Sequence, residues 1–497
     1  MRKQPILVLV VISIVLLTAC GQKPGVHSFA SDNGGLGGGN GTTASGPSGT
    51  GGPGGTSTTP GGTITGPGGT TASPGGTITG PGGTSGGGVA DSGCGVCVTP
   101  TTITIGIHAP VTGAAPIKAD AFNYGKDLYW NWLKVHGKSI YGRTVKFVFA
   151  DDHYNPQTAE AVCEQMATQQ HAFLLIGAAG TDQISQCAFY ANQHGIPYLS
   201  AGVTKSGTNY PTYFGITMTY SDQMPLLAQY VKKLGAGEDR VGPNGLPQAD
   251  NAIKVAMVSP DTPNFADARD AMVAAFTRLG APYQIRVYPV QKDENPTDAP
   301  GVIAQIKQWG ADIISPITAP VFTIALSNAS ASQQYFPRYV GVGITNAINQ
   351  AIPNECTSNQ FGGPGTGHPA AMFFSPFPGW EQRNQFDPDY DKAVALAGSG
   401  AQNINQKGNG GDLMWSLWGV SKGLYQMLLA AGPNLTRTGF MNTLSTYSTQ
   451  GSFKDFPNLT FTRSNKWGAY QVNALTADCA NKEWVEDPNN FGLHSSF

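Results

Sequence analysis

Between residues 102 and 342 the sequence alternates short runs of β-branched and aromatic residues with longer stretches of helical periodicity. The first series predicts strands at 102–108, 144–150, 173–177 and 197–199, with helices at 122–136, 157–170 and 182–194. The second series predicts strands at 254–258, 284–290, 313–315 and 339–342, with helices at 222–234, 265–279, 302–309 and 321–332. Because each strand–helix–strand unit lays its helix on a parallel sheet, two series predict an α/β fold of two doubly wound parallel-sheet lobes joined by a hinge.

The N-terminus carries an export signal. Arg2 and Lys3 precede an apolar run over 6–17 that ends in Leu-Thr-Ala-Cys20. As a helix this run rises about 18 Å, which is too short for a bilayer core of about 30 Å. The small residues before Cys20 resemble a lipobox, which predicts that Cys20 is diacylated and anchors the protein outside the cell membrane. Plain secretion with Cys20 removed is the alternative.

Residues 21–99 consist mainly of Gly, Thr, Ser and Pro and include two copies of one eleven-residue sequence, at 60–70 and 74–84. Such a segment cannot bury an apolar core, so we expect a disordered tether with an r.m.s. reach of about 50 Å. A collagen-like segment is excluded because glycine does not hold every third position. The predicted organisation is a signal peptide at 1–20, the tether at 21–99, the first part of lobe 1 at 100–222, the main part of lobe 2 at 223–370, and a return to lobe 1 with C-terminal crossover segments at 371–497.

Six cysteines remain besides Cys20. Extracytoplasmic proteins keep disulfides, and six thiols allow fifteen pairings. The expected pairs are Cys163 with Cys187, which lie in consecutive predicted helices, Cys356 with Cys479, and Cys94 with Cys97. The last pair has the C-x-x-C spacing of redox centres, but those begin a helix beside a strand, whereas this pair closes a glycine-rich segment. We therefore expect a local structural disulfide there.

The charge and the histidine content of the sequence limit the partners and cofactors that we expect. The net charge is −2 and only 12% of residues are charged, which leaves no basic surface for nucleic acid. The eight histidines are scattered and form no H-E-x-x-H motif, so neither a metal nor a cofactor is expected. His108 and His153 follow or end predicted strands; either could line a ligand site, but we expect exposed loop histidines.

Ligands of open α/β sheets bind beyond the carboxyl ends of the strands. The corresponding loops are 108–113, 151–155, 178–182 and 200–204 in the first lobe and 259–264, 316–319 and 341–346 in the second. Most are rich in Gly, Ala, Ser and Thr, which suits neutral hydrogen bonds to a small ligand better than acid–base chemistry.

One motif suggests an enzyme, because residues 419–423 fit the G-x-S-x-G pattern of hydrolases. That motif requires a strand, a strained turn and a helix. The stretch 413–431 instead has helical periodicity throughout, with expected core positions at Trp415, Trp418, Leu424, Leu428 and Leu429. We interpret the match as coincidental and the protein as a non-enzyme. A turn-rich loop at 363–367 also lacks the full dinucleotide fingerprint.

Several fragments in order resemble the type I periplasmic binding proteins, and among them the branched-chain amino acid and amide binders. They are Ile-Thr-Ile-Gly at 103–106, Pro-Val-Thr-Gly at 110–113, Tyr-Gly-Arg-Thr-Val at 141–145, Leu-Ile-Gly at 175–177, and Ile-Pro-Tyr-Leu-Ser at 196–200. The resemblance covers most of 102–484. It implies a monomeric solute-binding lipoprotein that captures a small polar solute, such as an amino acid, amide or carboxylate, for an ABC permease in the membrane.

The resemblance also implies where the solute binds. Thr181, at the start of a helix, and Gly202 and Thr204, after the next strand, match positions that hold the carboxylate and amino groups of the ligand. Thr181 could instead be a simple helix N-cap. The candidate ligand-binding residues are Thr112, Thr181, Gly202, Thr204, Asn264, Thr318 and Gly343.

The second lobe departs from the pattern of the amino-acid binders. Gly343 stands where those proteins place a carboxylate for the ligand's ammonium, and Asn264 with Phe265 replaces Tyr-Gly. Because a buried ammonium without a countercharge is costly, an amino acid ligand requires another acid, for which Asp120 and Asp261 are the candidates. The alternative functions are a ligand sensor for a membrane signalling partner and a secreted hydrolase, because the fold alone does not determine which function the protein has.

Overall fold

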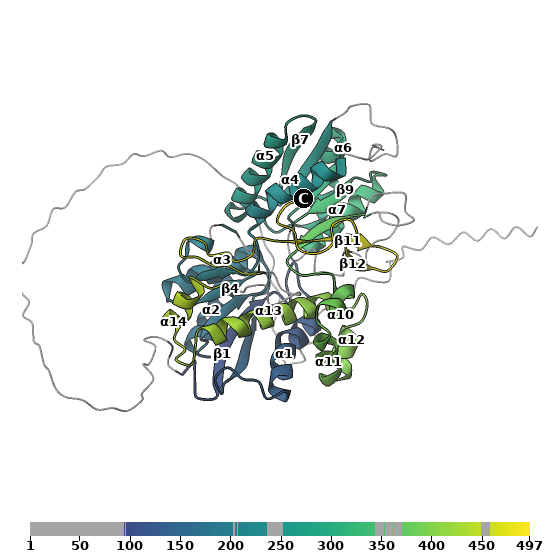
Figure 1. Cartoon of the computed structure of the whole chain (residues 1–497). Helices are drawn as coiled ribbons and strands as arrows, with labels where there is room; N and C mark the ends of the chain where they lie inside the picture. The colour runs from purple at the N-terminus through teal and green to yellow at the C-terminus, as the bar shows by residue number, and fades with distance from the viewer. Residues whose placement is uncertain are drawn as a thin grey trace, which may run out of the picture. The chain divides into compact units, whose positions relative to one another are not determined.

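The computed structural model describes residues 94, 96–201, 204–205, 207–235, 252–342, 352, 361, 370–448 and 458–497. Within these ranges the chain forms two sheets with helices packed on them (Figure 1). None of the helices in the described ranges has both the length and the apolar character needed to cross a bilayer.

The first sheet has five parallel strands in the order β2-β1-β3-β4-β5. They are β1 (Thr102–Ala109), β2 (Thr144–Asp151), β3 (Leu174–Gly177), β4 (Tyr198–Ser200) and β5 (Tyr213–Gly215). The connecting helices are α1 (Ala119–Val135), α2 (Pro156–Thr168) and α3 (Thr181–Gln193). The central strand β3 is buried along its whole length, which is the reason its sequence is an uninterrupted apolar run.

The second sheet has seven strands in the order β12-β11-β10-β9-β8-β6-β7. Its parallel part comprises β6 (Ile253–Pro260), β7 (Tyr283–Val290), β8 (Ile313–Pro316), β9 (Arg338–Gly341) and β10 (Met372–Ser375). An antiparallel ribbon of β11 (Asn473–Asp478) and β12 (Glu483–Glu486) extends it beyond β10. The accompanying helices are α4 (Tyr220–Gly235), α5 (Ala266–Leu279), α6 (Ala299–Trp309) and α7 (Pro320–Ser332). The prediction of two doubly wound lobes is confirmed.

Residues 371–497 contribute to both lobes, whereas the sequence led us to expect a return to lobe 1 with C-terminal crossover segments. The strands β10, β11 and β12 pair in the second sheet, where they satisfy the main-chain groups that the edge of β9 would otherwise expose. The helices of this segment are α10 (Arg383–Phe386), α11 (Asp389–Leu396), α12 (Ser399–Ile404), α13 (Gly411–Ala430) and α14 (Arg437–Leu444).

Helix α13 packs against α1. The side of α1 that it covers includes the buried residues Gly125 and Leu128, whereas Phe122 packs against Phe149 of β2, with ring centroids 5.0 Å apart. A side chain at Gly125 would meet Leu417 at 2.7 Å and the backbone of Met414 at 3.1 Å, so the glycine sets how closely the two helices approach.

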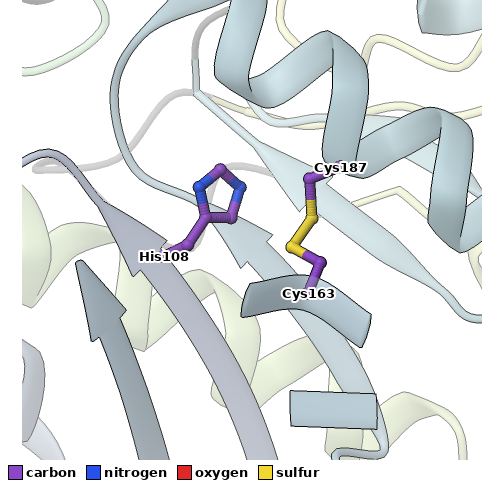
Figure 2. Close-up of side chains that lie close together, drawn as sticks. All are labelled: His108, Cys163 and Cys187. Carbon is purple, nitrogen blue, oxygen red and sulfur yellow. A yellow bond between two sulfur atoms is a disulfide. The ribbon is translucent and has the colours of Figure 1, made fainter. Parts of the chain in front are cut away.

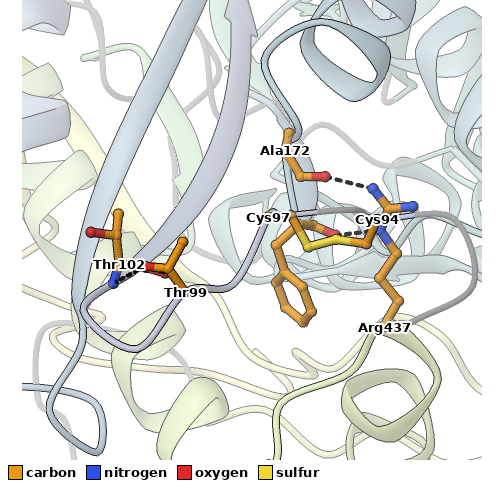
Figure 3. The surroundings of a disulfide bond; sticks show 7 residues. Cys94, Cys97, Thr99, Thr102, Ala172 and Arg437 are labelled. Carbon is orange, nitrogen blue, oxygen red and sulfur yellow. Dashed lines mark hydrogen bonds between the residues drawn. A yellow bond between two sulfur atoms is a disulfide. The ribbon is translucent and has the colours of Figure 1, made fainter. Parts of the chain in front are cut away.

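Helix α14 is joined to the first sheet by a buried arginine. Arg437 donates from Nη2 to the carbonyl oxygen of Ala172 (2.6 Å) and from Nε to that of Phe173 (3.0 Å), just before β3 begins. The Cys94–Cys97 disulfide lies beside this arginine (Figure 3).

Two disulfides are resolved between described cysteines. Cys94 is bonded to Cys97 ahead of β1, and Cys163 on α2 is bonded to Cys187 on α3. Cys479 is also disulfide-bonded. Cys356, its expected partner, lies outside the described residues, as do Cys20, residues 21–93 of the expected tether, and the loop at 363–367.

The predicted hinge segment 217–223 connects β5 to α4. Its side chains are tied to the backbone around them. Thr217 donates to the carbonyl of Ala201 (2.6 Å), and Gln223 donates to that of Met218 (3.0 Å). The hydroxyl of Thr219 accepts from the backbone N–H of Asp222 (3.0 Å) at the start of α4.

Candidate functional site

Residues at the carboxyl ends of strands in the two lobes contact one another directly. The phenol of Tyr154, which follows β2, donates to Oε2 of Glu294, which follows β7, at 3.2 Å. The amide of Asn264, which follows β6, donates to Oδ1 of Asp182 in the first turn of α3 at 2.5 Å. The strand-end loops of both sheets therefore come together at one place, where a doubly wound fold is expected to bind a ligand.

Glu294 is the buried acid of this group, with only 4% of its surface exposed. Both of its carboxylate oxygens accept from the backbone N–H of Ala319, at 3.0 and 3.1 Å, directly ahead of α7. Burial raises the pKa of Glu294 to about 7, and the nearby Asp182 and Asp293 add to the increase, while the hydrogen bonds from Ala319 and Tyr154 oppose it.

The backbone on both sides of this contact is in the left-handed region. Of the seven non-glycine residues with positive φ in the described ranges, three are here: His153 (55°), Tyr154 (54°) and Glu294 (48°). Such conformations cost on the order of 1 kcal/mol or more each and persist where the surrounding structure enforces them, often at functional sites. The left-handed backbone thus sets the direction in which the side chains of Tyr154 and Glu294 leave the main chain.

Thr181 belongs to the same group through Tyr220. It is the first residue of α3, and Gly180 (φ 82°) precedes it as the N-cap, so the interpretation of Thr181 as a simple N-cap is wrong. Its side chain hydrogen-bonds to that of Tyr220 at the start of α4. Burial raises the pKa of Tyr220, and Glu294 contributes to the same shift. Tyr220 in turn stacks on Phe265, with ring centroids 5.7 Å apart.

The other predicted ligand-binding residues lie in different surroundings. Thr204 is buried, and its neighbour Lys205 donates a backbone N–H to Asp267 of α5 at 3.1 Å, a third link between the lobes. Thr318 is buried, with its hydroxyl 2.9 Å from that of Thr323. Thr112 is exposed and donates to Asp151 at 2.6 Å. Gly202 and Gly343 lie outside the described residues.

Neither of the acids expected to compensate for Gly343 is buried. Asp120 is exposed in the first turn of α1. The side chain of Asp261 is 69% exposed and faces Arg269 at 3.7 Å. Glu294 was not predicted, because the polar run Lys-Asp-Glu-Asn at 292–295 looks like a solvated loop. The feature that could have identified Glu294 is its place in the loop after the strand predicted at 284–290. That loop is not among those expected to contact the ligand.

His108 is fully buried, so the expectation of an exposed loop histidine is wrong for it, whereas His153 is exposed. His108 lies within β1, with Nδ1 2.7 Å from a carboxylate oxygen of Asp152 and Nε2 2.8 Å from the phenol of Tyr198. These two partners satisfy both ring nitrogens, which is what makes burial of the imidazole tolerable.

His108 also lies close to Cys163 and Cys187, with all three candidate ligand atoms within 4.8 Å of one another (Figure 2). Both sulfur atoms belong to the disulfide, and both ring nitrogens have partners. In this state the cluster does not offer a set of metal ligands, because a metal requires thiolates and a free imidazole nitrogen.

The G-x-S-x-G motif at 419–423 lies in the interior of α13, as its helical periodicity predicts. Ser421 is buried, and Lys422 pairs with Asp387 at 2.7 Å. The motif is therefore part of a packed helix and does not form the strand–turn–helix of a nucleophile elbow.

Comparison with known proteins identifies the family to which this architecture belongs. Residues 102–466 match the model of a family described as periplasmic binding protein. No match was found among curated protein sequences.

Three similar solved structures share the fold at low identity. A fatty acid ABC transporter substrate-binding protein from Thermomonospora curvata has a TM-score of 0.60 at 16% identity, over 80% of this chain and 93% of its own. A solute-binding protein from R. palustris in complex with 4-hydroxybenzoate has a TM-score of 0.59 at 16% identity, over 80% and 97%. A branched chain amino acid ABC transporter protein from Thermus thermophilus with bound valine has a TM-score of 0.60 at 14% identity, over 80% and 97%. Because the family match covers the first sheet, the parallel strands of the second sheet and most of the chain, this protein belongs to the type I periplasmic binding proteins.

Proposed function

We propose that the protein is the extracytoplasmic solute receptor of an ABC importer and that it binds one small polar solute between its two lobes. The observation that carries this proposal is the inter-lobe group built from strand-end residues, in which Tyr154 meets Glu294 and Asn264 meets Asp182. The similar structures are named for a fatty acid, for 4-hydroxybenzoate and for valine, so this fold accommodates solutes of quite different chemistry.

The physical role of the two lobes is to desolvate the solute. When strand-end loops close around a ligand, buried polar groups lose water and require replacement partners, which gives selectivity for a solute that provides them. Thr181, Thr204 and Asn264 supply hydrogen-bonding side chains from both lobes. Contacts such as that between Tyr154 and Glu294 join the lobes at the proposed site, so binding of a solute there would be coupled to closure of the lobes.

The proposed location rests on the family, whose members are extracytoplasmic, and on the sequence of the N-terminus. Diacylated Cys20 would anchor the chain, and residues 21–99 would tether the receptor to the membrane that holds its permease partner. A monomer suffices for this role, because one chain supplies both lobes.

Mass spectrometry of the natively purified protein tests the function. We expect one co-purifying small molecule, and adding it back to refolded protein should raise the melting temperature while leaving the molecule chemically unaltered. Conversion of the solute would instead support the hydrolase alternative. Uptake of the labelled solute by cells should be lost when the receptor is deleted; binding without any uptake defect would support the sensor alternative.

A further inference from the structure

We propose that Glu294 is the charged specificity residue of the solute site and pairs with an ammonium group of the solute. It would thereby supply the carboxylate that the sequence lacks at position 343. This inference rests on the proposed function and adds to it the charge class of the ligand and the residue that recognises it.

The first argument is the place of Glu294 between the lobes. Its carboxylate is held from the second lobe by the N–H of Ala319, and among the described residues of the first lobe the phenol of Tyr154 donates to it at 3.2 Å. A carboxylate has about four lone-pair positions, and the donors within the described part of the chain do not fill them. A further donor that enters between the lobes can therefore bind to Glu294 without displacing Ala319.

The second argument is charge. The titratable groups that act on Glu294 are Asp182 on α3, Asp293 in its own loop and the phenol of Tyr154, and Tyr220 on α4 is coupled to it as well. Among the described residues, no lysine or arginine forms an ion pair with Glu294. A buried carboxylate surrounded by acids and phenols is unfavourable when ionised, and a cation is the partner that reverses this penalty.

The third argument is preorganisation. Tyr154 and Glu294 lie on opposite lobes, each on left-handed backbone, and the carboxyl is held by hydrogen bonds from Ala319 and Tyr154. A site that must hold an ammonium group benefits from acceptors whose positions are already set, because less entropy is lost on binding. The carboxylate of Glu294 would accept hydrogen bonds from the ammonium. Asp182, which is 2.5 Å from the amide of Asn264, would keep Asn264 in place beside it.

The sign of the pH dependence follows from the ligand charge. An ammonium solute requires ionised Glu294, so its affinity is full above pH 7 and falls as the pH drops through about 7. A carboxylate solute that contacted Glu294 would require the neutral acid and would show the opposite trend. Tyr154 stays protonated over this range, because burial next to Glu294 raises its pKa well above the ordinary value.

The test uses matched solute pairs and a matched control variant. Isothermal titration at pH 5.5, 7 and 8.5 compares L-leucine with 4-methylpentanoate, L-valine with 3-methylbutanoate, and 4-aminobutyrate with butyrate. The proteins are the full chain, Glu294→Gln, and Asp298→Asn, which removes an exposed carboxylate four positions further along the chain, at the end of the short 3-10 helix Pro296–Asp298. Circular dichroism and the melting temperature report whether each variant folds, and Tyr154→Phe provides a second change at the same contact.

We expect the full chain to bind the amine-bearing member of at least one pair, more weakly at pH 5.5 than at 8.5. Glu294→Gln should lose about thirtyfold or more of that affinity, together with its pH dependence, and Asp298→Asn should retain both. Unchanged amine binding by folded Glu294→Gln, or binding of the deaminated members alone, would overturn the inference while leaving the receptor function intact. If the full chain binds neither member of any pair, the inference is overturned. If, in addition, no small molecule co-purifies with the protein, the proposed function is overturned as well.

Discussion

Replacing Glu294 with glutamine should make the unliganded protein more stable at alkaline pH, although it removes a proposed binding group. The side chain keeps its size and one acceptor oxygen for the N–H of Ala319. What it loses is a carboxyl that is 4% exposed and whose pKa is raised from 4.5 to about 7.

The magnitude follows from proton linkage. A folded-state pKa above the unfolded value means that the folded protein binds the proton more tightly, so the contribution of Glu294 to stability is greatest below pH 4.5 and decreases as the pH rises to about 7. Above pH 7 the ionised carboxyl lowers the free energy of unfolding by about 3 kcal/mol, at roughly 1.4 kcal/mol per pH unit. Losing one acceptor oxygen costs glutamine about 1 kcal/mol. We therefore expect Glu294→Gln to gain about 2 kcal/mol at pH 8 and almost nothing at pH 5.

Urea unfolding of solute-free protein at pH 5 and pH 8, followed by circular dichroism, measures this difference. Burial also raises the pKa of Glu486 to about 7, so the parent protein should itself lose stability over this range; the variant-minus-parent difference isolates Glu294. Asp298→Asn, at an exposed position, should change stability by less than about 0.5 kcal/mol at both values. An equal gain at both pH values, or a loss at pH 8, would refute the reasoning.

Three further outcomes are expected. Cys20→Ala should move the protein from the membrane fraction to the medium, because the lipid is its only proposed anchor; retention in the membrane would contradict the lipoprotein hypothesis. Peptide mapping without reduction should recover Cys163 linked to Cys187, and free thiols at both positions would contradict the pairing. Saturating solute at a hundredfold excess over Kd should stabilise the protein by about 2.7 kcal/mol. Thr204→Ala and Thr181→Ala should each weaken that stabilisation by about 1 kcal/mol, and equal binding by both variants would contradict the assigned site.

Much of the fold could be predicted because its central parallel strands are largely buried. The run 174–177 is continuous in apolar residues, 102–109 is rich in β-branched residues, and the helices between them keep a clear period. The three-residue strand β5 and the edge ribbon of β11 and β12 carry no such signal. Their pairing is decided by the exposed edges of neighbouring strands, which the local sequence does not encode.

The candidate site was harder to predict than the fold. Thr181 and Asn264 could be proposed because each follows a recognisable strand or begins a helix. Glu294 could not, because its burial results from contacts with Ala319 and Tyr154 that are distant in the sequence. The burial of His108 could not be predicted for the same reason: only the tertiary structure brings Asp152 and Tyr198 to its ring nitrogens.

The packing of α13 on α1 has a consequence for the order in which the parts of this protein can fold during synthesis. Almost 300 residues separate the apolar side of α1 from the helix that covers it, and Arg437 reaches back to Ala172 across a similar separation. The second sheet's parallel strands β6 to β9, by contrast, follow one another in the chain. During synthesis the side of α1 around Gly125 and Leu128 therefore stays uncovered until α13 has emerged. Apolar surface exposed in this way favours aggregation unless a chaperone binds the chain or the chain is exported unfolded.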